Sequence, residues 1–175
     1  SKSSAISQVQ FELDANAGWV PKNAILNVTG LLPNAVTGGQ LKIRHVGDND
    51  QAGEFFRVMD ELGVFLSATT SSSPGVSCTT VHETTIPVTA SQINSWAANG
   101  VASFLLQANR DVLNYTDFIN PCGPLNAGNF DGISTLEAML MYNYAIVDYE
   151  IKKGAQILQS GQLTGGQTSV SLPPG

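Results

Sequence analysis

Apolar and polar residues alternate with a period of two along most of the chain, which is the pattern of β-strands that have one buried face. In the segment 40–46, for example, Leu41, Ile43 and His45 fall on one face. Turn residues such as Gly, Pro and Asn separate the segments from one another. Strands are predicted on this basis at 7–13, 23–32, 40–46, 54–61, 63–70, 77–88, 100–108 and 134–151.

Two of these predictions concern how the strands are joined. The segments 54–61 and 63–70 are expected to pair as a hairpin that turns through residues 60–63. The segment 134–151 is predicted to be the longest strand, because the alternation continues through all of it. Its apolar face would carry Leu136, Ala138, Leu140, Tyr142, Tyr144 and Ile146.

One segment, 89–99, has the pattern of a helix instead. Thr89 is a good N-cap, and Gln92 three residues later completes a capping box. Ile93 and Trp96 lie three residues apart on one face, and Gly100 fits the position just after a helix end. We expect this short helix to close one end of a β-sandwich, with Trp96 as its apolar wedge.

Evenly spaced strands and a single short helix predict an all-β protein, an antiparallel β-sandwich of jelly-roll type. We place the sandwich in residues 1–146 and a C-terminal β-hairpin or meander in residues 147–175. The meander would consist of a strand that ends at Ile151, a strand through Ile157 and Leu158, and a strand at 169–172. Because an unpaired edge of this length is an aggregation hazard, the tail is expected to pack on the sandwich or on a neighbouring subunit.

The composition narrows the class of protein. Of the 175 residues only 13% are charged, about half the usual share. A neutral polar surface of this kind is common in extracellular β-proteins that assemble side by side, and many isolated secreted domains share it. The formal net charge is −6, and the eight Lys and Arg residues form no cluster, which argues against nucleic-acid binding. The sequence has no apolar run of about 18 residues, so no membrane span is predicted. The first residues alternate between polar and apolar and do not have the pattern of a signal peptide. A secreted form would therefore have lost its leader.

The chain has two cysteines, Cys78 and Cys122, in no metal-binding spacing. They are interpreted either as a disulfide or as two buried thiols. The disulfide is favoured because the rest of the chain has the composition of a secreted protein. Closing a loop of this length would stabilise the fold by roughly 4 kcal/mol.

An acidic segment at 48–54 is the one candidate metal site. Asp48, Asp50 and Gly53 match the opening of an EF-hand loop, but Ala52 and Met59 stand where that loop needs ligands. An EF-hand is therefore rejected. Two interpretations remain. One is a β-sandwich calcium site built from Asp48, Asp50, Glu54 and backbone carbonyls, completed by distant acids such as Asp117 or Asp131. The other, which we favour, is a solvated acidic turn.

The stretches "GDNDQAGEFFRV" and "TIPVTASQINSWAANGVASFLLQ" resemble β-sandwich modules of jelly-roll or CUB-like type in large secreted bacterial surface proteins. The likeness covers roughly residues 24–146 and lies in the general pattern rather than in a diagnostic motif. It implies an extracellular jelly-roll fold that sometimes holds calcium.

The remaining candidates for chemistry are few. His45 is expected in the core, while His82 and its neighbour Glu83 should point to opposite faces of one strand. Trp19 is assigned to a loop, where it either packs beside Pro21 or contributes to a sugar-binding site. Further, Asn27 and Asn114 begin glycosylation acceptor patterns. The chain has no hydrolase, P-loop or dinucleotide-binding motif, so we do not expect an enzyme.

Two functions are compatible with these features. The favoured one is a non-enzymatic extracellular structural module, a subunit of a cell-surface filament or a segment of an adhesin. Its partners would be copies of itself or other surface proteins, joined by β-strand addition through the N-terminal segment or the C-terminal hairpin. The alternative is a calcium-dependent carbohydrate-binding module that uses the 48–54 segment and Trp19.

Overall fold

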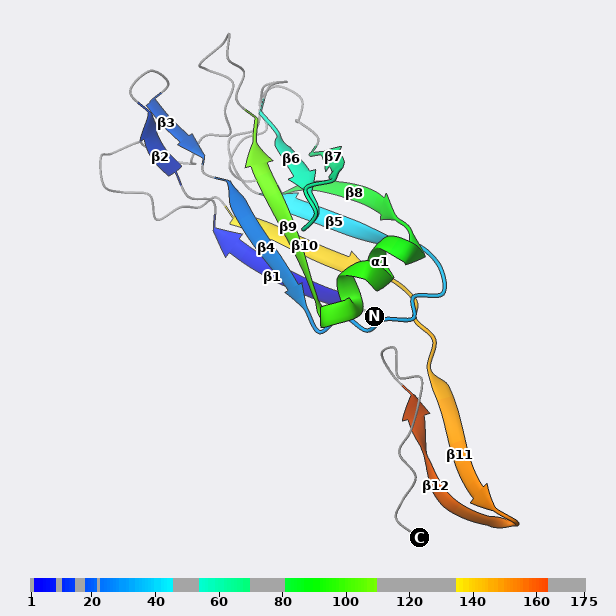
Figure 1. Cartoon of the computed structure of the whole chain (residues 1–175). Helices are drawn as coiled ribbons and strands as arrows, with labels where there is room; N and C mark the ends of the chain where they lie inside the picture. Colours follow the sequence, from blue (N-terminus) through cyan, green and yellow to red (C-terminus); the bar gives the residue numbers. More distant parts are fainter. Residues whose placement is uncertain are drawn as a thin grey trace.

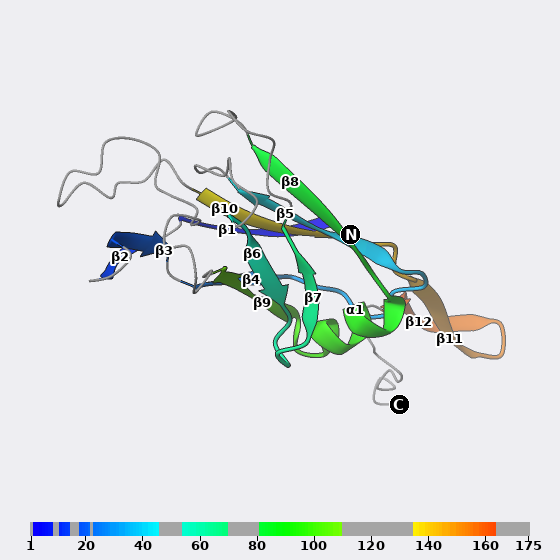
Figure 2. The ribbon, with the colours of Figure 1, turned by 90° about the horizontal axis from the view of Figure 1, so that it is seen from above.

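The structure is a computed structural model, and it describes residues 2–8, 11–14, 18–21, 23–45, 54–69, 81–109 and 135–163. Among these residues, eight strands form two four-stranded antiparallel sheets that lie face to face (Figures 1 and 2). Two further pairs of strands form hairpins outside these sheets. The all-β sandwich predicted from the sequence is therefore confirmed.

The first sheet has the strand order β1-β10-β5-β8. Its strands are β1 (Lys2–Gln8), β10 (Thr135–Met141), β5 (Gly39–His45) and β8 (His82–Val88). The second sheet has the order β4-β9-β6-β7, formed by β4 (Ala24–Thr29), β9 (Val101–Ala108), β6 (Phe56–Met59) and β7 (Phe65–Ala68). All neighbouring strands in both sheets are antiparallel.

This strand order is that of a jelly roll. In the sandwich, only β6 and β7 follow one another in the chain and also pair with one another. Every other connection between the eight strands crosses from one sheet to the other. Such a double-sheet arrangement leaves only four edge strands, β1, β8, β4 and β7.

The core lies between the sheets and consists of alternate residues of the strands. Along β9, Ala102, Phe104 and Leu106 are buried, and the residues between them face outward. Along β5, Leu41, Ile43 and His45 are buried, as the alternation predicts. Inward-facing residues of both sheets thus supply a single apolar layer.

The predicted helix is confirmed in detail. Helix α1 (Ala90–Trp96) has Thr89 as its N-cap and a complete capping box with Gln92, and it continues into the 3-10 turn η1 (Ala97–Asn99). Gly100 follows in the left-handed conformation, with φ of 80°. Trp96 is buried and meets the Phe104 ring edge-on at 5.2 Å between centroids. The helix closes one end of the sandwich (Figure 1).

The long strand predicted at 134–151 is wrong. Strand β10 ends at Met141, and a second strand, β11 (Val147–Lys153), begins after a linker and belongs to a different sheet. Tyr142 is buried, as expected, but Ile146 is 48% exposed. The alternation continues through the linker although the backbone changes direction there.

The N-terminal strand predicted at 7–13 is also divided. Strand β1 ends at Gln8, and β2 (Phe11–Asp14) pairs instead with β3 (Gly18–Pro21) as a separate hairpin. Because β1 pairs with β10 of the same chain, the N-terminal strand completes its own sheet.

The C-terminal hairpin consists of β11 and β12 (Gln156–Leu163). It projects away from the sandwich as a separate arm (Figure 1). The third strand predicted at 169–172 lies outside the described residues. In the part of the chain that the structure describes, no helix has the length and apolar character needed to cross a bilayer.

Candidate functional site

Most of the residues proposed as a calcium site cannot be placed. Asp48, Asp50, Asp117 and Asp131 lie outside the described residues, whereas Glu54 is described. Glu54 is 1% exposed and lies two residues before β6 of the second sheet. The favoured interpretation of a solvated acidic turn is therefore wrong for this carboxylate. The described residues contain no group of three or more His, Cys, Asp or Glu side chains arranged to hold a metal ion.

The other residues proposed from the sequence have mixed outcomes. Cys78, Cys122 and Asn114 fall outside the described ranges, so the disulfide stays a prediction. Trp19 lies in strand β3, where its backbone pairs with that of Leu13, and its assignment to a loop is wrong.

Asn27, the other proposed glycosylation acceptor, is exposed in the middle of strand β4. Its Oδ1 accepts a hydrogen bond of 2.8 Å from the hydroxyl of Ser103 on the neighbouring strand.

The strands that border the segments with these proposed residues nevertheless meet at one end of the sandwich. The register within each sheet puts the ends of β1 and β5 beside the starts of β8 and β10, and the ends of β7 and β9 beside the starts of β4 and β6. Figure 1 shows that both groups lie at the same end of the sandwich. For example, Gln8 lies opposite Thr135, and His45 lies opposite His82. The connections that contain the proposed calcium ligands and both cysteines all start from this end.

A stacked pair of histidines is buried at that end. His45 and His82 are directly opposite one another on β5 and β8, and their rings stack at 5.1 Å between centroids. His45 also meets the Phe56 ring edge-on at 5.8 Å. Burial, reinforced by the neighbouring His82, lowers the pKa of His45 to about 4, and burial also lowers the pKa of His82. Both expectations about these residues are confirmed, since His45 is in the core and Glu83 faces away from His82.

The outer face of the first sheet is charged. Glu137, Arg44 and Glu83 lie opposite one another on three adjacent strands, which places unlike charges side by side. Arg44 contacts Glu137 at 2.8 Å and Glu83 at 3.7 Å, and Lys42 contacts Glu83 at 2.6 Å. The hydrogen bond from Lys42, together with both cations, lowers the pKa of Glu83. Such paired charges are typical of a solvent-exposed surface.

The outer face of the second sheet is different. Ile25 lies opposite Leu105, Leu105 opposite Met59, and Met59 opposite Phe65, so one apolar row crosses all four strands. We call these four residues the outer row. Ile25 is 64% exposed and Phe65 51% exposed. Contiguous exposed apolar side chains mark candidate interaction surfaces, and at one end of this row the Arg57 guanidinium lies over the Phe65 ring, 5.4 Å from its centroid.

A groove lies along part of this row. It has a volume of about 450 Å³ and is lined by Ile25, Leu105 and Ser103 on one side and by the β6–β7 turn on the other. Asp60 shapes the turn, because its Oδ1 accepts hydrogen bonds from the amides of Leu62 at 3.0 Å and Val64 at 2.9 Å. Glu61 also lines the groove, and its side chain gives the rim an acidic group.

The second surface that no described segment covers is the hairpin formed by β11 and β12, residues 147–163, which we call the arm. Tyr149 and Ile151 on β11 share one face with Leu163 on β12, and each is only half-buried. The tip carries Ile157 and Leu158, which are 52% and 42% exposed. An isolated two-stranded hairpin is marginally stable in water, because it has no second layer to cover its apolar face.

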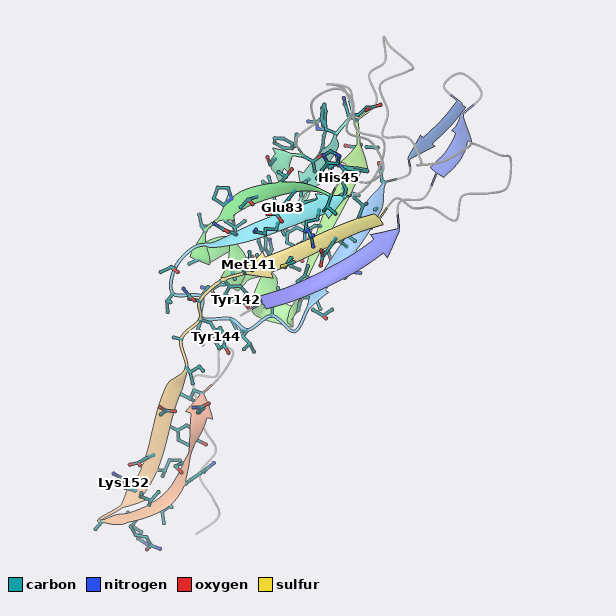
Figure 3. The ribbon with its side chains drawn as sticks, turned by 180° about the vertical axis from the view of Figure 1, so that it is seen from behind. His45, Glu83, Met141, Tyr142, Tyr144 and Lys152 are labelled. Carbon is teal, nitrogen blue, oxygen red and sulfur yellow. The ribbon has the colours of Figure 1, made fainter. Side chains whose placement is uncertain are left out.

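The base of the arm is fixed to the sandwich through Tyr142. The Tyr142 hydroxyl donates to the carbonyl of Leu32 and accepts from the amide of Leu32, each over 2.8 Å. Gly39 lies against the same place, since a Cβ there would collide with the carbonyl oxygen of Met141 and approach the Tyr142 Cβ to 2.8 Å. Figure 3 shows Met141, Tyr142 and Tyr144 in succession between β10 and the arm.

Backbone bonds hold the rest of the linker, residues 142–146. The amide of Ala145 donates to the carbonyl of Asn34 at 2.9 Å, and the amide of Val36 donates to the carbonyl of Asn143 at 3.2 Å. Tyr144 also forms an isolated β-bridge with Ala35. The direction in which the arm leaves the sandwich is therefore set by at least four hydrogen bonds.

Helix α1 fixes the loop that receives the linker. The amide of Ala35 donates to Asn94 Oδ1 at 2.7 Å, and Asn94 Nδ2 donates to the carbonyl of Ala35 at 3.3 Å. The helix, the 31–36 loop and the linker thus form one hydrogen-bonded unit at the end of the sandwich from which the arm projects (Figure 3).

The outer row and the anchor of the arm were not predicted from the sequence. The row is assembled from four strands, so it follows only from their register. Asn94 gave no local signal, although Pro33-Asn34 in the sequence does indicate a turn. Comparison of the chain with protein-family models, with curated proteins and with solved structures finds no match.

Proposed function

We propose that this protein is a non-enzymatic structural module of the extracellular space or cell surface, a subunit of a filament or a segment of an adhesin. It joins its partners through the C-terminal arm. The single observation that carries this proposal is a hairpin that projects from a complete jelly roll on a fixed base with its apolar face uncovered by any described segment.

The anchor of the arm supports an assembly role. A tail without function has no need of a defined direction, yet the linker is held by hydrogen bonds to the 31–36 loop. A rigid base lowers the entropy that the arm loses on binding, which favours association. The low content of charged residues agrees with a surface that lies against neighbouring molecules.

The first test is the mass of the full chain in solution, measured by light scattering after gel filtration, in calcium and again after chelation. We expect assemblies larger than the 18.4 kDa monomer that persist without calcium. The variant Ile151→Lys, which places a charge on the apolar face of the arm, should be monomeric. The matched control is Val81→Lys, at a 46% exposed residue next to β8, which should assemble like the unmodified chain.

Two outcomes would count against the proposal. A monomer in both conditions, over a wide range of concentration, would contradict assembly and would turn attention to glycan binding through Trp19. An assembly that dissociates only on chelation would assign the joining role to Asp48, Asp50 and Glu54 instead of the arm.

A further inference from the structure

We infer that the arm of one copy docks on the outer row of another copy, with the apolar face of the arm packed against Ile25, Leu105, Met59 and Phe65. This inference rests on the proposed function and deepens it by naming the surface that receives the arm. The argument begins from the two surfaces and from what prevents them from meeting within one molecule.

The arm has one polar and one apolar face. On the polar face Gln162 donates to Asp148 at 3.0 Å, and Lys152 pairs with Glu150 at 2.6 Å. On the other face the Tyr149 ring lies across Gly161, where an added Cβ would be 2.9 Å from its hydroxyl oxygen. Polar side chains thus pair with one another on the first face, and on the second face Gln159 donates to the Tyr149 hydroxyl at 3.1 Å. The apolar side chains Tyr149, Ile151 and Leu163 of this second face can pack on another layer.

The outer row presents a matching layer. A four-stranded sheet whose outer face carries a continuous apolar row can accept a second sheet packed face to face, at a distance of about 10 Å. The charged outer face of the other sheet, with its row Glu137–Arg44–Glu83, offers no such layer. Of the two outer faces, as the described residues form them, the one that carries the outer row therefore suits the arm.

The arm does not reach the outer row of its own molecule. Its base is pinned to the 31–36 loop, and from there it extends away from both sheets (Figures 1 and 3). Lys152, near the far end of the arm, lies well beyond the sandwich (Figure 3). The occupant of the row is therefore the arm of a second copy.

The charges of the two surfaces favour this contact. The arm carries two acidic residues, Asp148 and Glu150, and two basic ones, Lys152 and Lys153, so the formal net charge of −6 resides entirely outside it. Two negatively charged sandwich surfaces would repel one another, whereas an arm with no net charge and a basic tip would not. Glu61, an exposed carboxylate at the groove beside the outer row, provides an acidic partner for Lys153 at that tip.

The contact joins two different surfaces, so it is heterologous and leaves each end of an assembly with one free surface. This property gives a sharp test by mixing two variants of the full chain. Ile151→Lys has a defective arm and an intact row, and Ile25→Lys has an intact arm and a defective row. Leu163→Lys and Phe65→Asp are second variants of each kind, and circular dichroism with thermal unfolding verifies their folding.

We expect each variant alone to be monomeric, with association weakened roughly tenfold or more, because a charge would be buried in an apolar contact. An equimolar mixture of the two should give a dimer and nothing larger, since one intact arm meets one intact row. If Ile25→Lys and Phe65→Asp assemble like the unmodified chain while Ile151→Lys does not, the arm docks elsewhere. That result overturns this inference and leaves the proposed function standing.

Two other results are decisive as well. If both variants are monomeric and their mixture also stays monomeric, the two surfaces do not complement one another, and the inference is overturned. If the unmodified chain itself does not assemble, the proposed function fails first. The control Val81→Lys separates a specific effect from a general effect of added charge.

Discussion

The Tyr142 hydroxyl forms two hydrogen bonds with the backbone of Leu32: it donates to the carbonyl and accepts from the amide, each at 2.8 Å. One phenol therefore satisfies both polar groups of a residue that lies 110 positions away in the sequence. The contact holds Tyr142, which continues the buried side of β10, against the loop between β4 and β5 at the base of the arm.

We expect Tyr142→Phe to lower the free energy of unfolding by about 1–3 kcal/mol, because it leaves an amide and a carbonyl without partners at a largely buried site. Denaturation by urea measures this loss. The matched control is Tyr144→Phe, at a half-buried tyrosine that packs 6.3 Å from the Tyr142 ring. It should change stability by less than about 0.5 kcal/mol. Equal losses in the two variants would show that the hydroxyl of Tyr142 has no special role.

Gly39 and Gly63 should tolerate substitution differently. Gly39→Ala drives a Cβ into the backbone of Met141 and the side chain of Tyr142, so we expect a loss of roughly 2 kcal/mol or more. Gly63 has open space around its Cα but a φ of 76°, so alanine there costs about 1–2 kcal/mol through backbone strain alone.

Asparagine separates the two causes, because it tolerates the left-handed conformation. Gly63→Asn should recover part of the stability that Gly63→Ala loses, as measured by thermal unfolding. Gly39→Asn should destabilise the fold more than Gly39→Ala, because the larger side chain adds to the steric clash. The opposite order would contradict the steric explanation.

Stability should fall in mild acid because of His45. Its pKa is lowered to about 4 in the folded protein, from 6.5 in the unfolded chain. The unfolded state therefore binds more protons between these two values. The stabilisation is complete above pH 6.5 and falls as the pH decreases toward 4, by about 3 kcal/mol in total.

The variant His45→Phe keeps an aromatic ring beside Phe56 and His82 and removes the titrating group. Urea midpoints measured at pH 7.5 and pH 4.5 should differ less in this variant than in the unmodified chain. His82, whose pKa is also lowered by burial, should contribute a smaller effect in the same direction. An unchanged pH dependence in His45→Phe would assign acid sensitivity to other groups.

The capping box at the start of α1 should be measurable on its own. Thr89→Ala removes the oxygen that accepts from the amide of Gln92 at 3.2 Å and should cost about 1 kcal/mol. Ser91→Ala, at an exposed position inside the helix, should be neutral or slightly stabilising, because alanine is the better helix former. Thermal unfolding of both variants measures this difference in stability. Equal changes in the two variants would contradict a stabilising role for the capping box.

Local signals and long-range contacts explain what the sequence predicted and what it did not. The capping box, Trp96 and Gly100 all lie within one short segment, so helix α1 could be predicted in detail. The continuous strand at 134–151 was wrong because the alternation of Tyr142, Tyr144 and Ile146 is preserved where contacts with the 31–36 loop redirect the backbone. Period two indicates a strand, but it does not indicate to which sheet the strand belongs.

The same distinction applies to the candidate site. The arm was predicted because strand and turn residues alternate within 147–163, and its need for a partner followed from its unprotected edge. The outer row could not be found, because Ile25, Met59, Phe65 and Leu105 come together only through the register of four strands. The stacked histidines were missed for the same reason, since 37 positions separate His45 from His82.

The position of β10 determines when this protein can fold during synthesis. β10 lies between β1 and β5 in its sheet, so that sheet lacks one of its two central strands until residue 141 has left the ribosome. Until then the facing edges of β1 and β5 have no partner, and contacts between the start and the end of the chain are slow to form. The nascent chain therefore passes through a long aggregation-prone stage, and folding of the sandwich and exposure of the arm follow closely upon one another.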